Sequence, residues 1–163
     1  PTPSSAASDV YKRQVLELPL MRLYTAISGK GAWCEGEPIK CSKTSDVLSS
    51  LLSTGFSYKQ DKKWDLNMIL FKKLTRRSQG VRRFGSAALD ICYVADGRLD
   101  GFWEFNLQPW DTAAGILIAK EAGCVITNIK GDGFDIFQDN ILVSNGHLQA
   151  ELIKIISNVK TDF

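Results

Sequence analysis

Hydrophobic residues recur with a helical period in some segments of this chain and form short strand-like runs in others. Segments with apolar residues three and four positions apart, closed by glycine or basic residues, predict helices at 64–77, 86–97, 109–123 and 147–159. Short apolar or aromatic runs between turn residues predict strands at 79–84, 99–105, 124–129 and 141–144, a hairpin in 32–41, and two short strands or one bent strand in 15–27. The pattern of segment 46–54 fits either a helix or a strand. This alternation predicts an α/β fold, a layered sandwich of helices and a mixed sheet.

The size and composition of the chain are those of an ordinary globular domain. Its 163 residues suffice for one domain with a sizeable core. Twenty basic and 18 acidic side chains leave a net charge of +2, which gives no argument for a nucleic acid or a membrane surface as a partner. No apolar run approaches the length of a membrane span. We therefore expect no binding to nucleic acid or to a membrane.

The cysteines and the histidine narrow the chemistry further. Four cysteines show no CxxC or paired spacing, and Cys92 and Cys124 lie within apolar patterns, which is typical of buried, reduced thiols. Reduced thiols indicate a cytoplasmic protein. The single histidine, His147, leaves little room for histidine-based catalysis or for a zinc site.

The first fourteen residues differ from the rest of the chain. Segment 1–14 has no apolar period, and its composition is that of a disordered leader. Residues 9–14, DVYKRQ, back-translate with permitted codons to GAT GTG TAT AAG AGA CAG, which resembles a transposon end used to fragment DNA for sequencing libraries. We therefore expect segment 1–14 to be a sequencing-adaptor artefact or a disordered leader, and segment 15–163 to be a truncated domain.

Segment 85–115 contains the residues best suited to bind a ligand. Gly85, Ser86 and Ala87 open a predicted helix. Free N–H groups at a helix start favour an anion or a sugar hydroxyl, and glycine lets a ligand approach the backbone. A plain N-cap explains Ser86 equally well.

Two carboxylates follow within the same segment. Glu104, at the end of an apolar strand, is either an exposed acid or an acceptor of hydrogen bonds from the hydroxyls of a polyol. Asp111, at the start of the next helix, is either a cap or a ligand of Mg²⁺, and one aspartate cannot form a magnesium site alone. Arg82 and Arg83 could bind an anion or the carboxylate of a partner, and a solvated or interface pair explains them equally well.

Taken together, these segments resemble the inositol monophosphatase family of magnesium-dependent, lithium-sensitive sugar-phosphate phosphatases. The matching pieces are RRFGSAALD at 82–90, VADGRLDGFWE at 94–104, PWDTAAG at 109–115, EAG at 121–123, GKGAW at 29–33, GEPI at 36–39 and TGF at 54–56. The resemblance runs from about residue 15 to the C-terminus. It implies that segment 15–163 is the C-terminal part of the inositol monophosphatase fold.

The resemblance also implies roles for individual residues. In the family, the aspartate that matches Asp111 binds the second metal ion, and the residues that match Glu104 and Gly85, Ser86 and Ala87 contact inositol hydroxyls. It implies Mg²⁺ as the cofactor and a small phosphorylated polyol as the substrate, hydrolysed by metal-activated water in an in-line attack. It further implies that the full-length protein can form a homodimer.

The upstream part of the family pattern has no counterpart in this sequence. An acidic glutamate, the motif D-P-[IL]-D-G-T and the threonine that helps to position the attacking water are absent. We therefore expect no catalytic residue within this chain and no activity from it alone, whereas its complete form would hydrolyse inositol monophosphate. Two alternatives stay open: another small phosphate ester, such as histidinol phosphate or fructose bisphosphate, and a non-catalytic scaffold or regulatory relative.

Overall fold

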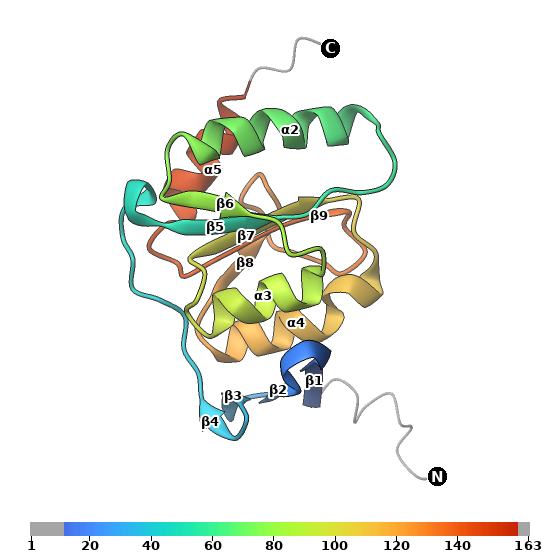
Figure 1. The fold of residues 1–163 in the computed structure, drawn as a ribbon, viewed down its shortest axis with the longest axis vertical. Coiled ribbons are helices and arrows are strands. Elements are labelled where there is room, and N and C mark those ends of the chain that lie inside the picture. The colour runs from blue at the N-terminus through green and yellow to red at the C-terminus, as the bar shows by residue number, and fades with distance from the viewer. Residues whose placement is uncertain (1–11, 160–163) are drawn as a thin grey trace.

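The computed structural model describes residues 12–159, which form two sheets and several helices (Figure 1). The strands are β1 (Lys12–Glu17), β2 (Arg22–Ile27), β3 (Gly31–Cys34), β4 (Glu37–Pro38), β5 (Leu51–Thr54), β6 (Gly80–Arg82), β7 (Gly101–Phe105), β8 (Val125–Thr127) and β9 (Asn140–Ser144). The helices are α2 (Lys62–Thr75), α3 (Ala87–Ala95), α4 (Pro109–Glu121) and α5 (Gln149–Ser157), with the short 3₁₀ turns η1 (Leu18–Leu20) and η2 (Val47–Ser49).

Most elements form where the sequence pattern predicts them. The start of α2 is fixed by Asp61, whose carboxylate accepts hydrogen bonds from the N–H groups of Lys63 and Trp64 at 3.0 and 3.1 Å. Pro109 begins α4 because its fixed φ suits the first helical position. The ambiguous segment 46–54 forms η2 followed by β5, and its strand character comes from pairing with β6 and β7.

The first strand begins earlier than its apolar pattern predicts. β1 starts at Lys12 and pairs antiparallel with β2, so that Lys12 lies opposite Ile27 and Gln14 lies opposite Thr25. The ladder continues because β2 offers partners along its whole length, and it takes in three residues of the segment predicted as a leader. Residues 1–11 lie outside the described residues, and the adaptor origin of segment 1–14 stays a prediction.

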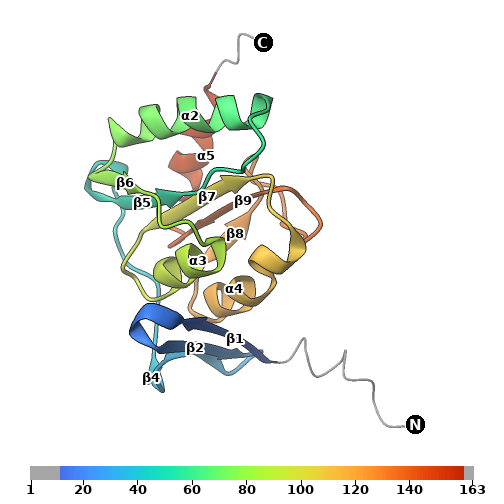
Figure 2. The same ribbon diagram turned by 45° about the vertical axis from the view of Figure 1, so that its right-hand side comes forward.

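The two sheets and the helices stack in layers, which confirms the predicted α/β sandwich (Figures 1 and 2). One sheet is antiparallel with the order β1-β2-β3-β4, and the other is mixed with the order β6-β5-β7-β9-β8. In the mixed sheet, β6, β5 and β7 are parallel, while β9 and β8 run antiparallel to their neighbours. Helices α2 and α5 cover one face of this sheet, and α3 and α4 lie between its other face and the antiparallel sheet.

Two hydrophobic clusters hold these layers together. Alternate residues of β7 supply them: Phe102 belongs to the cluster shared with α3, α4 and the antiparallel sheet, and Trp103 belongs to the cluster under α2 and α5. Both side chains are buried. Cys92 and Cys124 are buried free thiols, in accord with the sequence pattern. Within the described part of the chain, no helix is both long and apolar enough to cross a bilayer.

A carboxylate at the end of α4 ties the antiparallel sheet to the rest of the molecule. Glu121 accepts hydrogen bonds from the backbone N–H groups of Gly29 and Gly31 at 2.8 and 2.9 Å. Both glycines have positive φ, 73° and 112°, so the turn between β2 and β3 directs its N–H groups towards one side chain. A single charged group therefore holds the tip of this hairpin.

We expect Glu121→Gln to lower the free energy of unfolding by about 1 kcal/mol, because an amide has only one acceptor oxygen for the two N–H groups and loses the charge. Urea unfolding measures the change. Glu151→Gln is the matched control, since Glu151 is exposed on α5, and we expect it to stay within about 0.5 kcal/mol of the wild type. Equal unfolding curves for all three proteins would contradict the role of Glu121.

Candidate functional site

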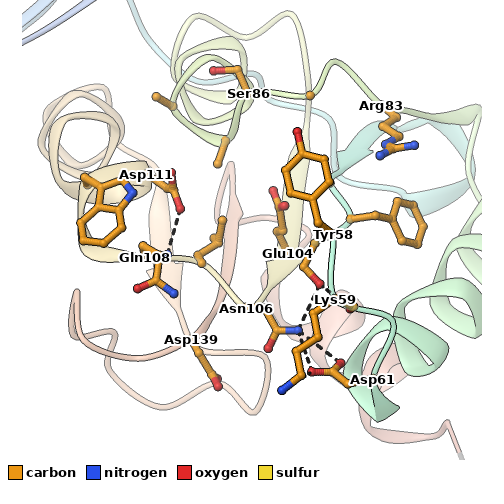
Figure 3. Close-up of a pocket in the computed structure, with 18 residues that line it drawn as sticks. Tyr58, Lys59, Asp61, Arg83, Ser86, Glu104, Asn106, Gln108, Asp111 and Asp139 are labelled. Carbon is orange, nitrogen blue, oxygen red and sulfur yellow. Dashed lines mark hydrogen bonds and ion pairs between the residues drawn. The ribbon is translucent and has the colours of Figure 1, made fainter.

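A cavity of about 890 Å³ opens at the carboxyl ends of β5 and β7, beside the starts of α3 and α4 (Figure 3). Its wall includes all the site residues singled out from the sequence: Gly85, Ser86, Ala87, Glu104 and Asp111. These residues come from three different elements and span 27 positions of the chain. The fold therefore brings the predicted substrate-binding residues and the predicted metal ligand to one place, and their roles remain predictions.

The parallel pairing of β5 with β7 places the floor of this cavity. Thr54 lies opposite Trp103 in the register, so the residues that follow, Gly55 and Glu104, are neighbours at the edge of the sheet. The carboxyl ends of adjacent parallel strands meet at one edge, which is where ligands bind in α/β sheets. The sequence alone does not show that these two residues meet, because nearly fifty positions separate them.

The start of α3 lies at the wall of the cavity. Ser86 occupies the N-cap position, but its side chain makes no capping hydrogen bond. The first N–H groups of a helix have no partner within the helix, and Ala87 and Ala88 line the cavity. Gly85 has a φ of +88°, and a Cβ built on it would meet no atom within 4 Å. Ser86 therefore does not cap the helix through its side chain, and the ligand-binding role of Gly85, Ser86 and Ala87 remains a prediction.

Glu104 presents an unpartnered carboxyl group to the cavity. It lies on the face of β7 that packs towards α3, and none of residues 12–159 donates a hydrogen bond to its side chain. Burial raises the pKa of Glu104 to about 8, and the negative charges of Asp90 and Asp111 add to this effect, whereas Arg83 opposes it. Such a group is available to accept hydrogen bonds from a ligand.

Asp90 of α3, whose charge raises the pKa of Glu104, was not selected from the sequence. It is completely buried, and neither carboxylate oxygen has a hydrogen-bond partner among the described residues. Burial raises the pKa of Asp90 to about 7, an effect that the nearby Ser53 hydroxyl and the backbone N–H of Ser86 oppose. Two neighbouring carboxyl groups in such surroundings do not both ionise readily near neutral pH.

Asp111 combines capping with a free acceptor. It is the third residue of α4, and its Oδ2 accepts the backbone N–H of Gln108 at 2.9 Å, which fixes the side chain at the helix entrance (Figure 3). Oδ1 accepts no hydrogen bond from the described residues, so capping leaves one oxygen for a cation. Within residues 12–159 there is no cluster of three or more acidic, histidine or cysteine side chains that could hold a metal. Asp111 thus fits Mg²⁺ as one ligand, and the described residues do not complete the site.

The far wall of the cavity consists of polar residues that the sequence analysis missed. Asn106 donates to both oxygens of Asp61 at 3.2 and 3.3 Å, and Asp139 forms an ion pair with Lys63. Their signal in the sequence is weak: Asn106 follows an apolar strand, but polar residues after strands are common in loops.

The two arginines before α3 differ in position. Arg83 lines the cavity, with its guanidinium carbon 5.3 Å from the centre of the Phe56 ring. Arg82 is exposed and is not part of the cavity wall. Of the two, Arg83 is the one that lines the cavity, and its charge lowers the pKa of Glu104.

Comparison with known proteins shows a consistent set of relatives. The family model described as "Inositol monophosphatase family" matches residues 14–161. The chain is 48% identical over 136 residues to "Phosphatase IMPL1, chloroplastic" of Arabidopsis thaliana. This alignment covers 83% of this chain and 37% of that protein. It is 43% identical over 135 residues to "Inositol-1-monophosphatase" of Synechocystis, covering 83% of this chain and 47% of that protein.

Other relatives carry a different kind of name. The chain is 39% identical over 135 residues to "Putative Nus factor SuhB" of Neisseria meningitidis, covering 83% of this chain and 52% of that protein. The chain thus spans about half or less of the length of these curated relatives.

Solved structures agree with the sequence comparisons. An inositol monophosphatase from Anabaena superposes with a TM-score of 0.85 at 38% identity, covering 90% of this chain and 58% of that one. The family model covers nearly all of the described residues, and the fold is that of the solved relatives. This chain belongs to the inositol monophosphatase family.

Proposed function

We propose that this chain forms the substrate-facing part of a Mg²⁺-dependent phosphomonoesterase that hydrolyses inositol monophosphate. Water adds to phosphorus, the bond from phosphorus to the polyol oxygen breaks, and the products are inositol and inorganic phosphate. The observation that carries the proposal is the convergence of Glu104, the start of α3 and Asp111 on one cavity. Family membership supports the reaction class.

Each part of the cavity has a distinct task in this proposal. The Glu104 carboxyl group accepts hydrogen bonds from hydroxyls of the polyol, since no described residue occupies it. The backbone at Gly85 and the first N–H groups of α3 approach the bound ester, where donors at a helix start favour an anion or a hydroxyl. Arg83 at the rim adds a positive charge that favours a phosphorylated substrate.

Asp111 is the residue of this chain that we propose to bind the metal. Its Oδ1 is free, and its carboxylate is held by the N–H of Gln108. When bound, Mg²⁺ would activate water and neutralise charge on the phosphate. The remaining ligands and the group that positions the water are not supplied by the described residues, so we propose that the chain alone is inactive.

Two alternatives differ in kind. The first is that the same cavity binds another small phosphate ester, such as histidinol phosphate or fructose bisphosphate. A non-catalytic or regulatory role is the second alternative, and the relatives named as Nus factors support it. A cytoplasmic location, a homodimer and the absence of nucleic-acid binding remain predictions.

The proposed activity is tested in the full-length protein, meaning this chain extended upstream to the length of its relatives. We expect Mg²⁺-dependent release of phosphate from inositol monophosphate and a loss of about a hundredfold or more in Asp111→Asn. Asparagine keeps an oxygen that can accept the N–H of Gln108, so the helix cap survives while the charge is lost. Phosphate release is measured at several Mg²⁺ concentrations.

Asp65→Asn is the matched control, because Asp65 is exposed on α2 and lies outside the cavity wall, and its activity should equal that of the wild type. Full activity of Asp111→Asn would show that Asp111 only caps the helix. A wild-type protein without phosphatase activity would favour the non-catalytic alternative. Residues 1–163 alone should release no phosphate.

The charge state of Glu104 makes stability depend on pH. Its ordinary pKa is 4.5, and that of the folded protein is about 8. Between these values the folded state keeps a proton that the unfolded state has released, so stability falls as pH rises through this range. We expect the wild type to lose at least about 1 kcal/mol more than Glu104→Gln between about pH 6 and pH 8.5.

Urea unfolding of the full-length protein at several pH values measures this difference. Glu151→Gln is the matched control and should keep the slope of the wild type, because Glu151 is exposed. Parallel pH profiles for the wild type and Glu104→Gln would show that Glu104 has an ordinary pKa.

A further inference from the structure

The carboxyl group of Glu104 lies directly against the backbone of Gly55. A Cβ built on Gly55 would be 2.3 Å from Cδ, Oε1 and Oε2 of Glu104, and real Cβ atoms essentially never come closer than 3.0 Å to such atoms. Equal distances to the three atoms mean that the flat face of the carboxyl group covers Gly55. The lone pairs lie in the plane of that group, so both oxygens direct their acceptor sites away from Gly55.

Glycine is needed at this position for space and not for its backbone conformation. The φ of Gly55 lies outside the left-handed region, in contrast to that of Gly85. An alanine can therefore adopt the same backbone without strain. What an alanine would disturb is the carboxyl group of Glu104, which is the far end of a flexible side chain.

The backbone of Gly55 is itself held in place from the other face of the sheet. Asn67 of α2 is 2% exposed, and its amide donates to the carbonyl oxygen of Gly55 at 2.6 Å. The oxygen of the Asn67 side chain accepts a hydrogen bond from the indole N–H of Trp103 at 2.6 Å. Trp103 is the residue before Glu104. Thr54 donates to the carbonyl oxygen of Trp103 at 2.6 Å. Because these groups are buried, Glu104 must move when a side chain is added to Gly55.

We propose that Gly55 is a positioning residue that sets selectivity for hydroxyl-bearing phosphate esters by fixing the orientation of the Glu104 carboxyl group. This inference rests on the proposed function and deepens it. Hydrogen bonds to a carboxylate are directional, and no described residue competes for the oxygens of Glu104. If the carboxyl group of Glu104 is rotated away from Gly55, its oxygens face the cavity at a different angle. The hydroxyls of the polyol then lose their hydrogen-bond acceptor.

Gly55→Ala in the full-length protein tests this proposal. We compare kcat/KM for myo-inositol 1-phosphate with kcat/KM for phenyl phosphate, an ester without free hydroxyls. The ratio should fall about tenfold in the variant, mainly through KM for the inositol ester, since a hydrogen bond to the carboxyl group of Glu104 is lost. Hydrolysis of phenyl phosphate should stay within about twofold of the wild type. An unchanged ratio would overturn the proposal.

A second pair of variants separates positioning from a general structural effect. In a Glu104→Ala background there is no carboxyl group to displace, so adding Gly55→Ala should leave the ratio unchanged. The same loss in both backgrounds would show that the backbone is responsible and would overturn the proposal. Gly133→Ala is the matched control: a Cβ there meets nothing within 4 Å, Gly133 is not part of the cavity wall, and the ratio should equal that of the wild type.

The crystal structure of Gly55→Ala provides a readout that does not depend on activity. The carboxyl group of Glu104 should be displaced from its place over residue 55 while β5 and β7 keep their register. A carboxyl group that has not moved would overturn the positioning role. A wild-type protein that hydrolyses neither ester would contradict the proposed function, and this structure would still decide whether Gly55 orients Glu104.

Discussion

The parallel pairing of β5 with β7 is the constraint on which the rest of the molecule depends. It sets Thr54 opposite Trp103, and this register places Gly55 beside Glu104 at the edge of the sheet where the cavity opens. The same pairing divides the core, because alternate residues of β7 pack on opposite faces. A shift of one residue would turn Trp103 towards α3 and Glu104 towards α2, and both cores and the cavity would be lost.

The electrostatics of the cavity follow from this geometry. Glu104 from β7 and Asp111 from α4 line the cavity, and Asp90 from α3 is buried nearby. Burial together with repulsion among these carboxyl groups raises the pKa of Glu104. Arg83 is the cavity-lining residue whose charge opposes this effect. A site with this imbalance favours ligands that bring a cation, hydroxyl donors or both. A phosphorylated polyol with Mg²⁺ has this chemistry.

Local sequence patterns predicted most of the helices and strands. The spacing of apolar residues, the prolines and the helix caps each determine secondary structure within a few residues of the chain. The pattern failed where pairing decides the outcome. Segment 46–54 became η2 and β5 because β6 and β7 flank it, and Lys12 joined β1 because β2 offered a partner. Asp111 illustrates a related ambiguity: capping and metal binding competed as explanations, and the structure shows a capped carboxylate that keeps one oxygen free.

The sequence by itself determined the family, the layered α/β fold and the set of residues from Gly85 to Asp111 that line the cavity, since these depend on contiguous motifs. It did not determine the contacts that orient those residues. Gly55 contacts Glu104, and the buried Asn67 links Gly55 to Trp103. The buried Asp90 acts on the charge of Glu104. Each of these interactions joins segments that are distant along the chain. Only tertiary structure decides such contacts, because strand register and helix packing, not local preference, bring these side chains together.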